Sequence, residues 1–202
     1  MKALFLDRDG VINENLPTHV TSWAEFQFIP RALDALRLLG DMEYRIIVIT
    51  NQAIINRGIV PRATVDEINA RMVDEVQRQG GRIDAVLYCP HRQDEACACR
   101  KPMPGMVLHA ATRWQIDLTR SVLIGDALTD MGVGQAVGCQ SILVRTGRGR
   151  QQLAMQDGEP RTFRVMRDLL SAARWLQWTT ARDERDEASD TVRATHAGGV
   201  FA

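Results

Sequence analysis

The chain has 202 residues, 45% of them hydrophobic and 25% charged, with a formal net charge of zero at pH 7. This length is enough for one domain with a buried core, and the composition is that of a globular protein. The zero net charge gives no indication of a nucleic-acid or membrane partner, although a local group of cations can still bind a small anion. The N-terminal segment lacks the apolar run of a signal peptide, and no segment has the length of a membrane span, so we expect a cytoplasmic protein. We also expect a monomer.

Short apolar strands alternate with amphipathic helices along most of the chain. The predicted strands cover residues 3–7, 44–50, 83–89, 121–126 and 139–144, and the predicted helices cover residues 31–39, 64–81, 104–116 and 163–178. Thr64 and Glu67 have the spacing of a capping box. The alternation predicts one α/β domain over residues 1–178 with a single doubly wound, mostly parallel sheet. Residues 179–202 are rich in charge and lack apolar periodicity, so we expect a disordered tail there.

Four of the predicted strands end in polar residues, namely Asp7, Thr50, Cys89 and Asp126. The carboxyl ends of parallel strands lie at one edge of a sheet, which is where ligands bind in this class of fold. Asp9 follows Asp7 in an Asp-x-Asp pattern that, by itself, is as often a solvated turn. Acids brought together from two strands repel one another unless a cation joins them, and Mg²⁺ prefers oxygen ligands of this kind.

Potential hydrogen-bond donors accompany these acids. Thr50, Asn51 and Lys101 could supply a hydroxyl, an amide and an ammonium group near the carboxylates. Acids with a metal, together with such donors, are what phosphoryl transfer requires. Asp130 lies one helical turn beyond Asp126, where it is expected to cap a helix or to support the other acids.

Three of the four cysteines are concentrated with one histidine in a short loop. The four side chains offer a closed tetrahedral ligand set for a structural Zn²⁺: Cys89, His91, Cys97 and Cys99. In a reducing compartment such a cluster favours a metal over disulfides, the alternative being a loop of unrelated thiols. A zinc ion with four protein ligands has no open position, so we expect it to order the loop and thereby to place Arg100 and Lys101, which follow directly.

Several motifs occur in the order found in one enzyme superfamily. "DRDGVIN", "FQFIP", "TNQAIINRG", "CPH", "CRKPMPGM" and "IGDALTDM" follow one another between about residues 2 and 147. Together they resemble the haloacid dehalogenase superfamily of phosphatases, and within it the branch of D-glycero-D-manno-heptose 1,7-bisphosphate phosphatases and histidinol-phosphate phosphatases. The resemblance implies a Rossmann-like core without a large cap domain. The zinc loop at residues 89–99 would then be the main wall of an open site for a small phosphorylated sugar.

The resemblance also implies roles for individual residues. Asp7 would be the nucleophile that forms an aspartyl-phosphate, and Asp9 would be the general acid and then the general base. Mg²⁺ would lie between Asp7, the backbone carbonyl of Asp9, and Asp126, while Thr50 and Lys101 would hold the transferring phosphoryl group. Substrate contacts are implied for Asn15, Thr18, Asn51, Gln52 and Arg100.

Three functional hypotheses remain open from the sequence. The first is a Mg²⁺-dependent phosphatase for the 7-phosphate of a heptose 1,7-bisphosphate, which "TNQAIINRG" favours. The second is a histidinol-phosphate phosphatase, which the five-residue spacer between His91 and Cys97 favours. The third is a zinc-stabilised binding module without catalysis. One departure from the heptose branch is Ala127, where many members have lysine. The basic segment 145–150, "RTGRGR", is expected to be a flexible, solvated loop, the alternative being that it reaches a second phosphate.

Overall fold

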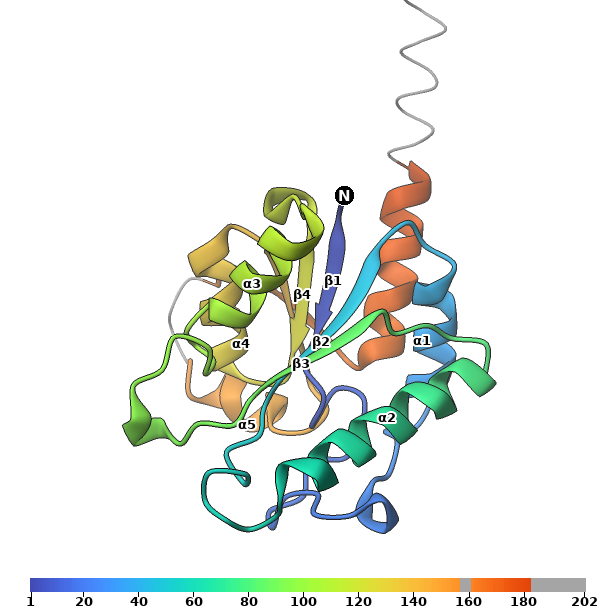
Figure 1. Cartoon of the computed structure of the whole chain (residues 1–202). Coiled ribbons are helices and arrows are strands. Elements are labelled where there is room, and N and C mark those ends of the chain that lie inside the picture. Colours follow the sequence, from blue (N-terminus) through green and yellow to red (C-terminus); the bar gives the residue numbers. More distant parts are fainter. Residues whose placement is uncertain (157–160, 183–202) are drawn as a thin grey trace, which may run out of the picture.

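The fold is built on one parallel sheet, seen in a computed structural model that describes residues 1–156 and 161–182. Its six strands lie in the order β3-β2-β1-β4-β5-β6, with all neighbouring pairs parallel (Figure 1). They are β1 (Ala3–Leu6), β2 (Arg45–Asn51), β3 (Ala85–Cys89), β4 (Val122–Gly125), β5 (Gln140–Val144) and β6 (Arg164–Met166). The chain winds outward from β1 in one direction and then in the other, which confirms the predicted doubly wound sheet.

Helices connect the strands and cover both faces of the sheet. They are α1 (Ala32–Gly40), α2 (Arg62–Arg78), α3 (Gly105–Trp114), α4 (Leu128–Val137), α5 (Gly149–Ala154) and a final helix over residues 169–182. Short 3-10 turns occupy η1 (Trp23–Glu25), η2 (Gln93–Glu95) and η3 (Leu118–Arg120). Within the described residues no large cap domain interrupts the connections, so the carboxyl ends of the strands remain open to solvent.

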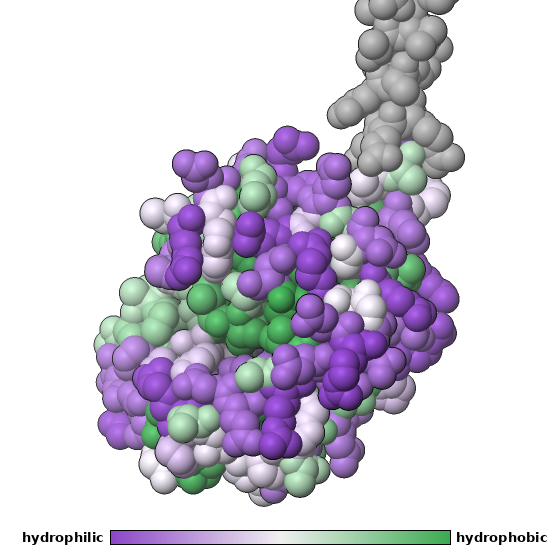
Figure 2. All heavy atoms as spheres, turned by 45° about the vertical axis from the view of Figure 1, so that its right-hand side comes forward, coloured by the Kyte–Doolittle hydropathy of each residue, from purple (hydrophilic) through white to green (hydrophobic). Residues whose placement is uncertain are grey.

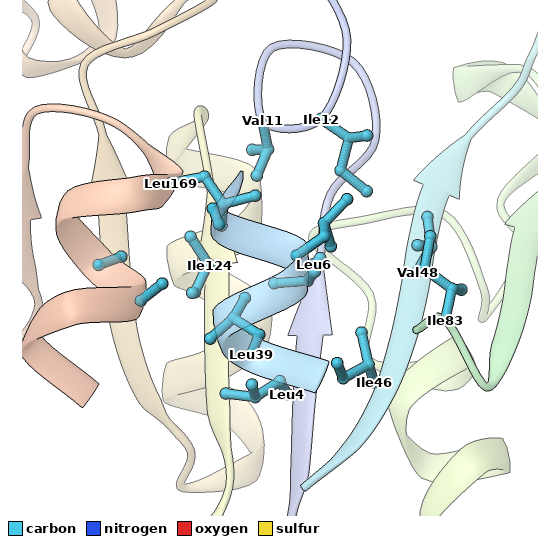
Figure 3. Packing of buried hydrophobic residues seen from close by; sticks show 14 of the residues in the cluster. Leu4, Leu6, Val11, Ile12, Leu39, Ile46, Val48, Ile83, Ile124 and Leu169 are labelled. Atoms are coloured by element: carbon cyan, nitrogen blue, oxygen red, sulfur yellow. The ribbon is translucent and has the colours of Figure 1, made fainter. Parts of the chain in front are cut away.

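The strands are buried on both faces, which explains their continuous apolar sequences. Side chains of β1 alternate, with Leu4 and Leu6 in the cluster formed with α1, α2 and the final helix, and Phe5 in the cluster formed with α3 and α4. Figure 3 shows Leu4 and Leu6 beside Leu39 of α1, with Leu169 of the final helix on the same face. The two clusters hold the sheet rigidly from both sides, so the loops at its carboxyl edge extend from a fixed base.

The apolar residues are largely withdrawn from the surface. The face shown in Figure 2 is mostly hydrophilic, with one group of apolar residues near its centre. Among the described residues, no helix combines the length and apolar character needed to cross a bilayer.

The start of α2 differs from the prediction. The expected capping box of Thr64 and Glu67 is wrong, because α2 begins at Arg62 with Pro61 as its N-cap. Thr64 lies inside the first turn, where its backbone N–H donates to the carbonyl of Pro61. With proline as the N-cap, the helix starts three residues earlier than it would with Thr64 as the N-cap.

The C-terminal region also differs from the prediction. The segment predicted as one helix over 163–178 contains β6, which pairs with β5, and its helix begins only at residue 169. The predicted disordered tail begins too early, because residues 179–182 continue this helix and the Thr179 hydroxyl donates to the carbonyls of Trp175 and Leu176. The rest of the predicted tail lies outside the described residues.

Two leucine-to-alanine substitutions test this packing. Leu36→Ala, on the buried side of α1, is expected to lower the free energy of unfolding by about 2–5 kcal/mol through lost burial and a residual cavity. Leu108→Ala removes the same atoms from α3, where Leu108 is 47% exposed. It should change the free energy of unfolding by less than about 0.5 kcal/mol. Urea unfolding followed by circular dichroism measures both, and similar values for the two variants would contradict this assignment of the core.

Candidate active site

A pocket of about 370 Å³ opens at the carboxyl edge of the sheet. Asp7 and Asp9 enter it from the loop after β1, Thr50 from the end of β2, and Lys101 from the end of the cysteine loop. The topology therefore brings together groups that are far apart in the sequence, as the strand-end pattern predicts.

The ammonium group of Lys101 lies at the base of this site. Its Nζ is 2.8 Å from Asp7 Oδ1 and 2.7 Å from Asp130 Oδ1, and it donates to the carbonyl of Ile49 at 3.0 Å. Burial by itself would lower the pKa of Lys101, but the two carboxylates raise it above its usual value. The lysine is therefore held as a cation by ion pairs with two carboxylates and by one hydrogen bond to a backbone carbonyl.

Three buried carboxylates lie close together, and two of them form ion pairs with this buried ammonium. Asp7, Asp126 and Asp130 each place a carboxylate oxygen within 4.8 Å of the others. Burial raises the pKa of Asp7 to about 6, with Lys101 opposing and Asp130 adding to the shift. Burial and the charge of Asp7 likewise raise the pKa of Asp126. Such an excess of buried negative charge suits a hard divalent cation with oxygen ligands.

Asp126 is enclosed by two glycine-containing loops. A Cβ atom on Gly10 or Gly147 would lie 2.1 Å or 2.2 Å from Asp126 Oδ2, and both residues have positive φ. The backbone N–H of Arg148 donates to the same oxygen at 2.8 Å, and its Nη2 is 3.5 Å from Oδ1. The expectation of a flexible, solvated loop at 145–150 is correct only in part: Arg145 and Arg150 are exposed, but Gly147 and Arg148 pack against Asp126 and α5 begins at Gly149. This loop packs over the site, because only glycine permits so close an approach.

The carboxylate of Asp9 is held by donors from three side chains. Its Oδ1 accepts from Arg8 Nη2 at 3.0 Å and from Asn13 Nδ2 at 2.9 Å, and its Oδ2 accepts from Arg8 Nη2 at 3.0 Å and from Gln52 Nε2 at 2.8 Å. Burial acts to raise the pKa of Asp9, but the charge of Arg8 and these hydrogen bonds outweigh it and lower the pKa. Gln52 Nε2 also lies 2.9 Å from Thr50 Oγ1, which links β2 to the acid.

The cysteine loop closes on itself through its four predicted metal ligands. The Cys89 sulfur is 3.0 Å from the Cys99 sulfur and 3.5 Å from the Cys97 sulfur. The Nδ1 atom of His91 is 3.5 Å from the Cys89 sulfur and 3.2 Å from the Cys99 sulfur. A tetrahedral Zn²⁺ with bonds of about 2.3 Å needs sulfur atoms roughly 3.8 Å apart, so the set fits this ion after slight expansion. Burial acts to raise the pKa of Cys97, but the backbone N–H of Arg100 and further hydrogen bonds lower it to about 7.

The end of this loop is fastened to β2. The Asn51 side chain accepts from the backbone N–H of Lys101 at 3.0 Å and donates to its carbonyl at 3.1 Å. Arg100 Nη1 donates to the carbonyl of His91 at 3.1 Å. Asn51, predicted to bind substrate, therefore also fixes the backbone of Lys101, because one amide satisfies both of its polar groups.

The structure places the remaining predicted residues as follows. Asn15 lines the pocket, as do Asn51, Gln52 and Arg100. Thr18 does not line it, because the chain turns between Leu16 and His19 and leaves the Thr18 side chain exposed.

The sequence alone did not indicate several residues of the site. Those that line the pocket or support it include Arg8, Asn13, Arg57, Arg92, Thr129 and Arg148. Only Arg148 carried a usable signal, since it lies in a basic glycine-rich loop after a strand.

Comparisons with known proteins show similarity along nearly the whole chain. Residues 98–172 match the family model described as "HAD-hyrolase-like". The chain is 39% identical over 176 residues to the D-glycero-beta-D-manno-heptose-1,7-bisphosphate 7-phosphatase of Bordetella bronchiseptica, covering 87% of this chain and 98% of that protein. It is 41% identical to the protein of the same name from Pseudomonas putida, covering 87% and 99% of the two chains.

The structural comparison agrees with the sequence comparison. The crystal structure of the B. bronchiseptica D,D-heptose 1,7-bisphosphate phosphatase, complexed with magnesium and phosphate, superposes with a TM-score of 0.84 at 38% identity. The match covers 89% of this chain and 99% of that one. The enzyme of the same name from Burkholderia thailandensis superposes with a TM-score of 0.68 at 33% identity, covering 88% and 99%.

The raised pKa of Asp7 predicts a pH-dependent stability difference in metal-free protein. A raised pKa means that the folded state binds the proton more tightly than the unfolded chain, so stability falls as pH rises from 3.8 through about 6. Asp7→Asn has no charge to bury and should be more stable than wild type at pH 7, by up to roughly 3 kcal/mol. This advantage should shrink toward zero near pH 4.

Urea unfolding at several pH values in the presence of EDTA measures this difference. Asp74→Asn, on the exposed surface of α2, is the matched control and should show no such trend. A constant difference between Asp7→Asn and wild type across this pH range would contradict the predicted shift.

Proposed function

The chain belongs to the family of D-glycero-beta-D-manno-heptose-1,7-bisphosphate 7-phosphatases, which are haloacid dehalogenase-like hydrolases, and we propose on this basis that it hydrolyses the 7-phosphate of a heptose 1,7-bisphosphate. The observation that carries the proposal is the meeting of Asp7, Asp9, Thr50 and Lys101 at one pocket of about 370 Å³. That volume lies in the range of small-molecule sites.

Asp7 is the proposed nucleophile. With a pKa of about 6 it is mostly a carboxylate at pH 7, which is the form that can attack phosphorus. A bond forms between its oxygen and phosphorus as the bond from phosphorus to the sugar oxygen breaks. The Lys101 ammonium and the Thr50 hydroxyl line the same pocket, and they are the proposed contacts of the transferring phosphoryl oxygens.

Asp9 is the proposed acid and base. In its protonated form it gives a proton to the departing sugar oxygen and becomes a carboxylate, which then takes a proton from the water that attacks the aspartyl-phosphate. The donors around it stabilise its carboxylate form, which is the form that the second step needs.

A Mg²⁺ ion fits the acidic end of the site. Asp7 and Asp126 would hold it with the backbone carbonyl of Asp9. Asp130 would remain outside this set, because Lys101 and the backbone N–H of Ala127 occupy its two oxygens. When bound, Mg²⁺ neutralises charge on the phosphoryl oxygens. The magnesium and phosphate named for the B. bronchiseptica structure support this proposal.

A Zn²⁺ ion fits the closed set of Cys89, His91, Cys97 and Cys99. Its proposed contribution is structural, because four protein ligands leave no position for substrate. The ion would order the loop that delivers Arg100 and Lys101 to the pocket.

The rim of the pocket is suited to a second phosphate. Four arginines line it, Arg57, Arg92, Arg100 and Arg148, together with His19. A bisphosphate has an anionic group at each end, so cations around the sugar would retain the phosphate that is not hydrolysed. Arg148, beside Asp126, supplies a cation on the side where Ala127 lacks one.

The two other hypotheses are less well supported. The relatives reported above are named for heptose bisphosphate, which favours that substrate over histidinol phosphate. A binding module without catalysis would not require the buried arrangement of Asp7, Asp130 and Lys101, since burying these charges is costly.

Phosphate release from defined substrates tests the function. With excess Mg²⁺, the protein should release one phosphate per heptose 1,7-bisphosphate and leave the 1-phosphate, as followed by a phosphate assay and ³¹P NMR. Histidinol phosphate should react at least about tenfold more slowly by kcat/KM, because it cannot use the second set of cations. Asp7→Asn should abolish release, and Asp74→Asn should not. Faster turnover of histidinol phosphate would show that histidinol phosphate is the preferred substrate. No phosphate release from either compound would favour the binding module.

Removal of one zinc ligand tests the proposed role of the loop. Purified protein should contain about one Zn²⁺ per chain by elemental analysis, from the closed ligand count. Cys97→Ser should lose the ion and lower turnover on the order of 10²-fold, because a displacement of about 1 Å at Lys101 is enough for such a loss. Added Mg²⁺ should not restore it. Cys139→Ser, a buried cysteine outside the cluster, should keep both zinc and turnover. Normal turnover by zinc-free protein would contradict the proposal that zinc binding in the loop positions Lys101.

A further inference from the structure

Arg8, between the two aspartates of the site, is almost completely buried. It is 1% exposed and is among the largest fully buried side chains. Its Nη2 is 3.0 Å from both carboxylate oxygens of Asp9, and its Nη1 donates to Asn69 Oδ1 at 2.9 Å. One guanidinium group therefore joins the acid of the site to helix α2.

Asn69 is the only polar residue on the buried face of α2. The other buried residues of this helix are Val65, Ile68, Met72 and Val76. Within the described residues, Asn69 Nδ2 has no hydrogen-bond partner, and Arg8 is the partner of its Oδ1. A buried amide with an unpaired donor costs stability, so packing does not explain an asparagine at this position.

The geometry of arginine explains what this contact does. The guanidinium group is planar and its donors have fixed directions. A hydrogen bond that holds Nη1 therefore sets the direction of Nη2 as well. Without an acceptor at residue 69, a buried Nη1 would be left unpaired, and rotation of the group toward another acceptor would move Nη2 away from Asp9.

We propose that Asn69 is a positioning residue that acts through Arg8 to fix the orientation of the Asp9 carboxylate. The inference rests on the proposed phosphatase function. In the step concerned, an Asp7 oxygen bonds to phosphorus as the bond from phosphorus to the alcohol oxygen breaks, and the Asp9 proton passes to that oxygen. Asn69 touches none of the reacting atoms and lies on a different element from them.

The predicted signature is a loss that depends on the leaving group. An alkyl alcohol leaves poorly without a proton, whereas 4-nitrophenolate leaves well without one, so only the alkyl substrate needs an oriented Asp9. The ratio kcat/KM covers the steps up to departure of the alcohol, so later hydrolysis of the aspartyl-phosphate does not enter. Asn69→Leu removes the acceptor at nearly constant size. It should lower kcat/KM for heptose 1,7-bisphosphate about 10- to 100-fold, and for 4-nitrophenyl phosphate less than about threefold.

Three further variants separate positioning from simple destabilisation. Asn69→Asp keeps an oxygen acceptor for Arg8 and should recover most of the loss. Ile68→Val trims the adjacent buried residue of α2 and should leave the ratio between the two substrates unchanged. In an Asp9→Asn background, Asn69→Leu should cause no further leaving-group-dependent loss, because the group that it positions is already gone.

Equal losses for both substrates, or unchanged kcat/KM for both, would overturn the proposal. So would a full additional loss from Asn69→Leu in the Asp9→Asn background. If Asn69→Leu does not fold, Arg8→Lys serves instead, because an ammonium group cannot bridge Asn69 and Asp9 and should cause the same selective loss. If heptose 1,7-bisphosphate is not hydrolysed, the proposed function fails. The positioning role is then tested with glucose 6-phosphate as the alkyl substrate.

Discussion

The site depends on one buried ammonium group, that of Lys101, held between the carboxylates of Asp7 and Asp130. Removing such charges from water costs several kcal/mol per ion, and their attraction offsets this only when the geometry is good and the remaining hydrogens are paired. The carbonyl of Ile49 accepts a hydrogen bond from the same ammonium group, which adds to the two ion pairs. The rest of the site can be understood as the framework that keeps this lysine in place.

Two separate frames hold the two charges that the proposed reaction uses. The first frame places Lys101: the residue follows the cysteine loop directly, and the Asn51 amide hydrogen-bonds to its backbone N–H and carbonyl. The second places Asp9 through Arg8 and Asn69 of α2. Each frame uses buried polar contacts whose loss would leave a partner unsatisfied, which gives a stiff support without a cap domain.

Charge is segregated over a short distance in this chain. The formal net charge is zero, yet the base of the pocket holds buried carboxylates while arginines gather at its rim. Gly10 and Gly147 make this possible at Asp126, because their loops approach its carboxylate more closely than any side chain allows. The acids at the base suit a cation and the arginines at the rim suit an anion, so a metal ion and a phosphate group could bind in the same pocket.

The sequence by itself determined the parallel sheet, the acids at its carboxyl edge and the four zinc-type ligands. Those features follow from local periodicity, strand polarity and ligand spacing, which are written in neighbouring residues. Only the tertiary structure decided that Arg148 reaches Asp126, that Thr18 does not line the pocket, and that Arg8 links Asn69 to Asp9. These contacts join residues up to 61 positions apart, and they depend on loop paths and helix rotation. No local pattern specifies those paths, because the choice is made by packing against the rest of the folded chain.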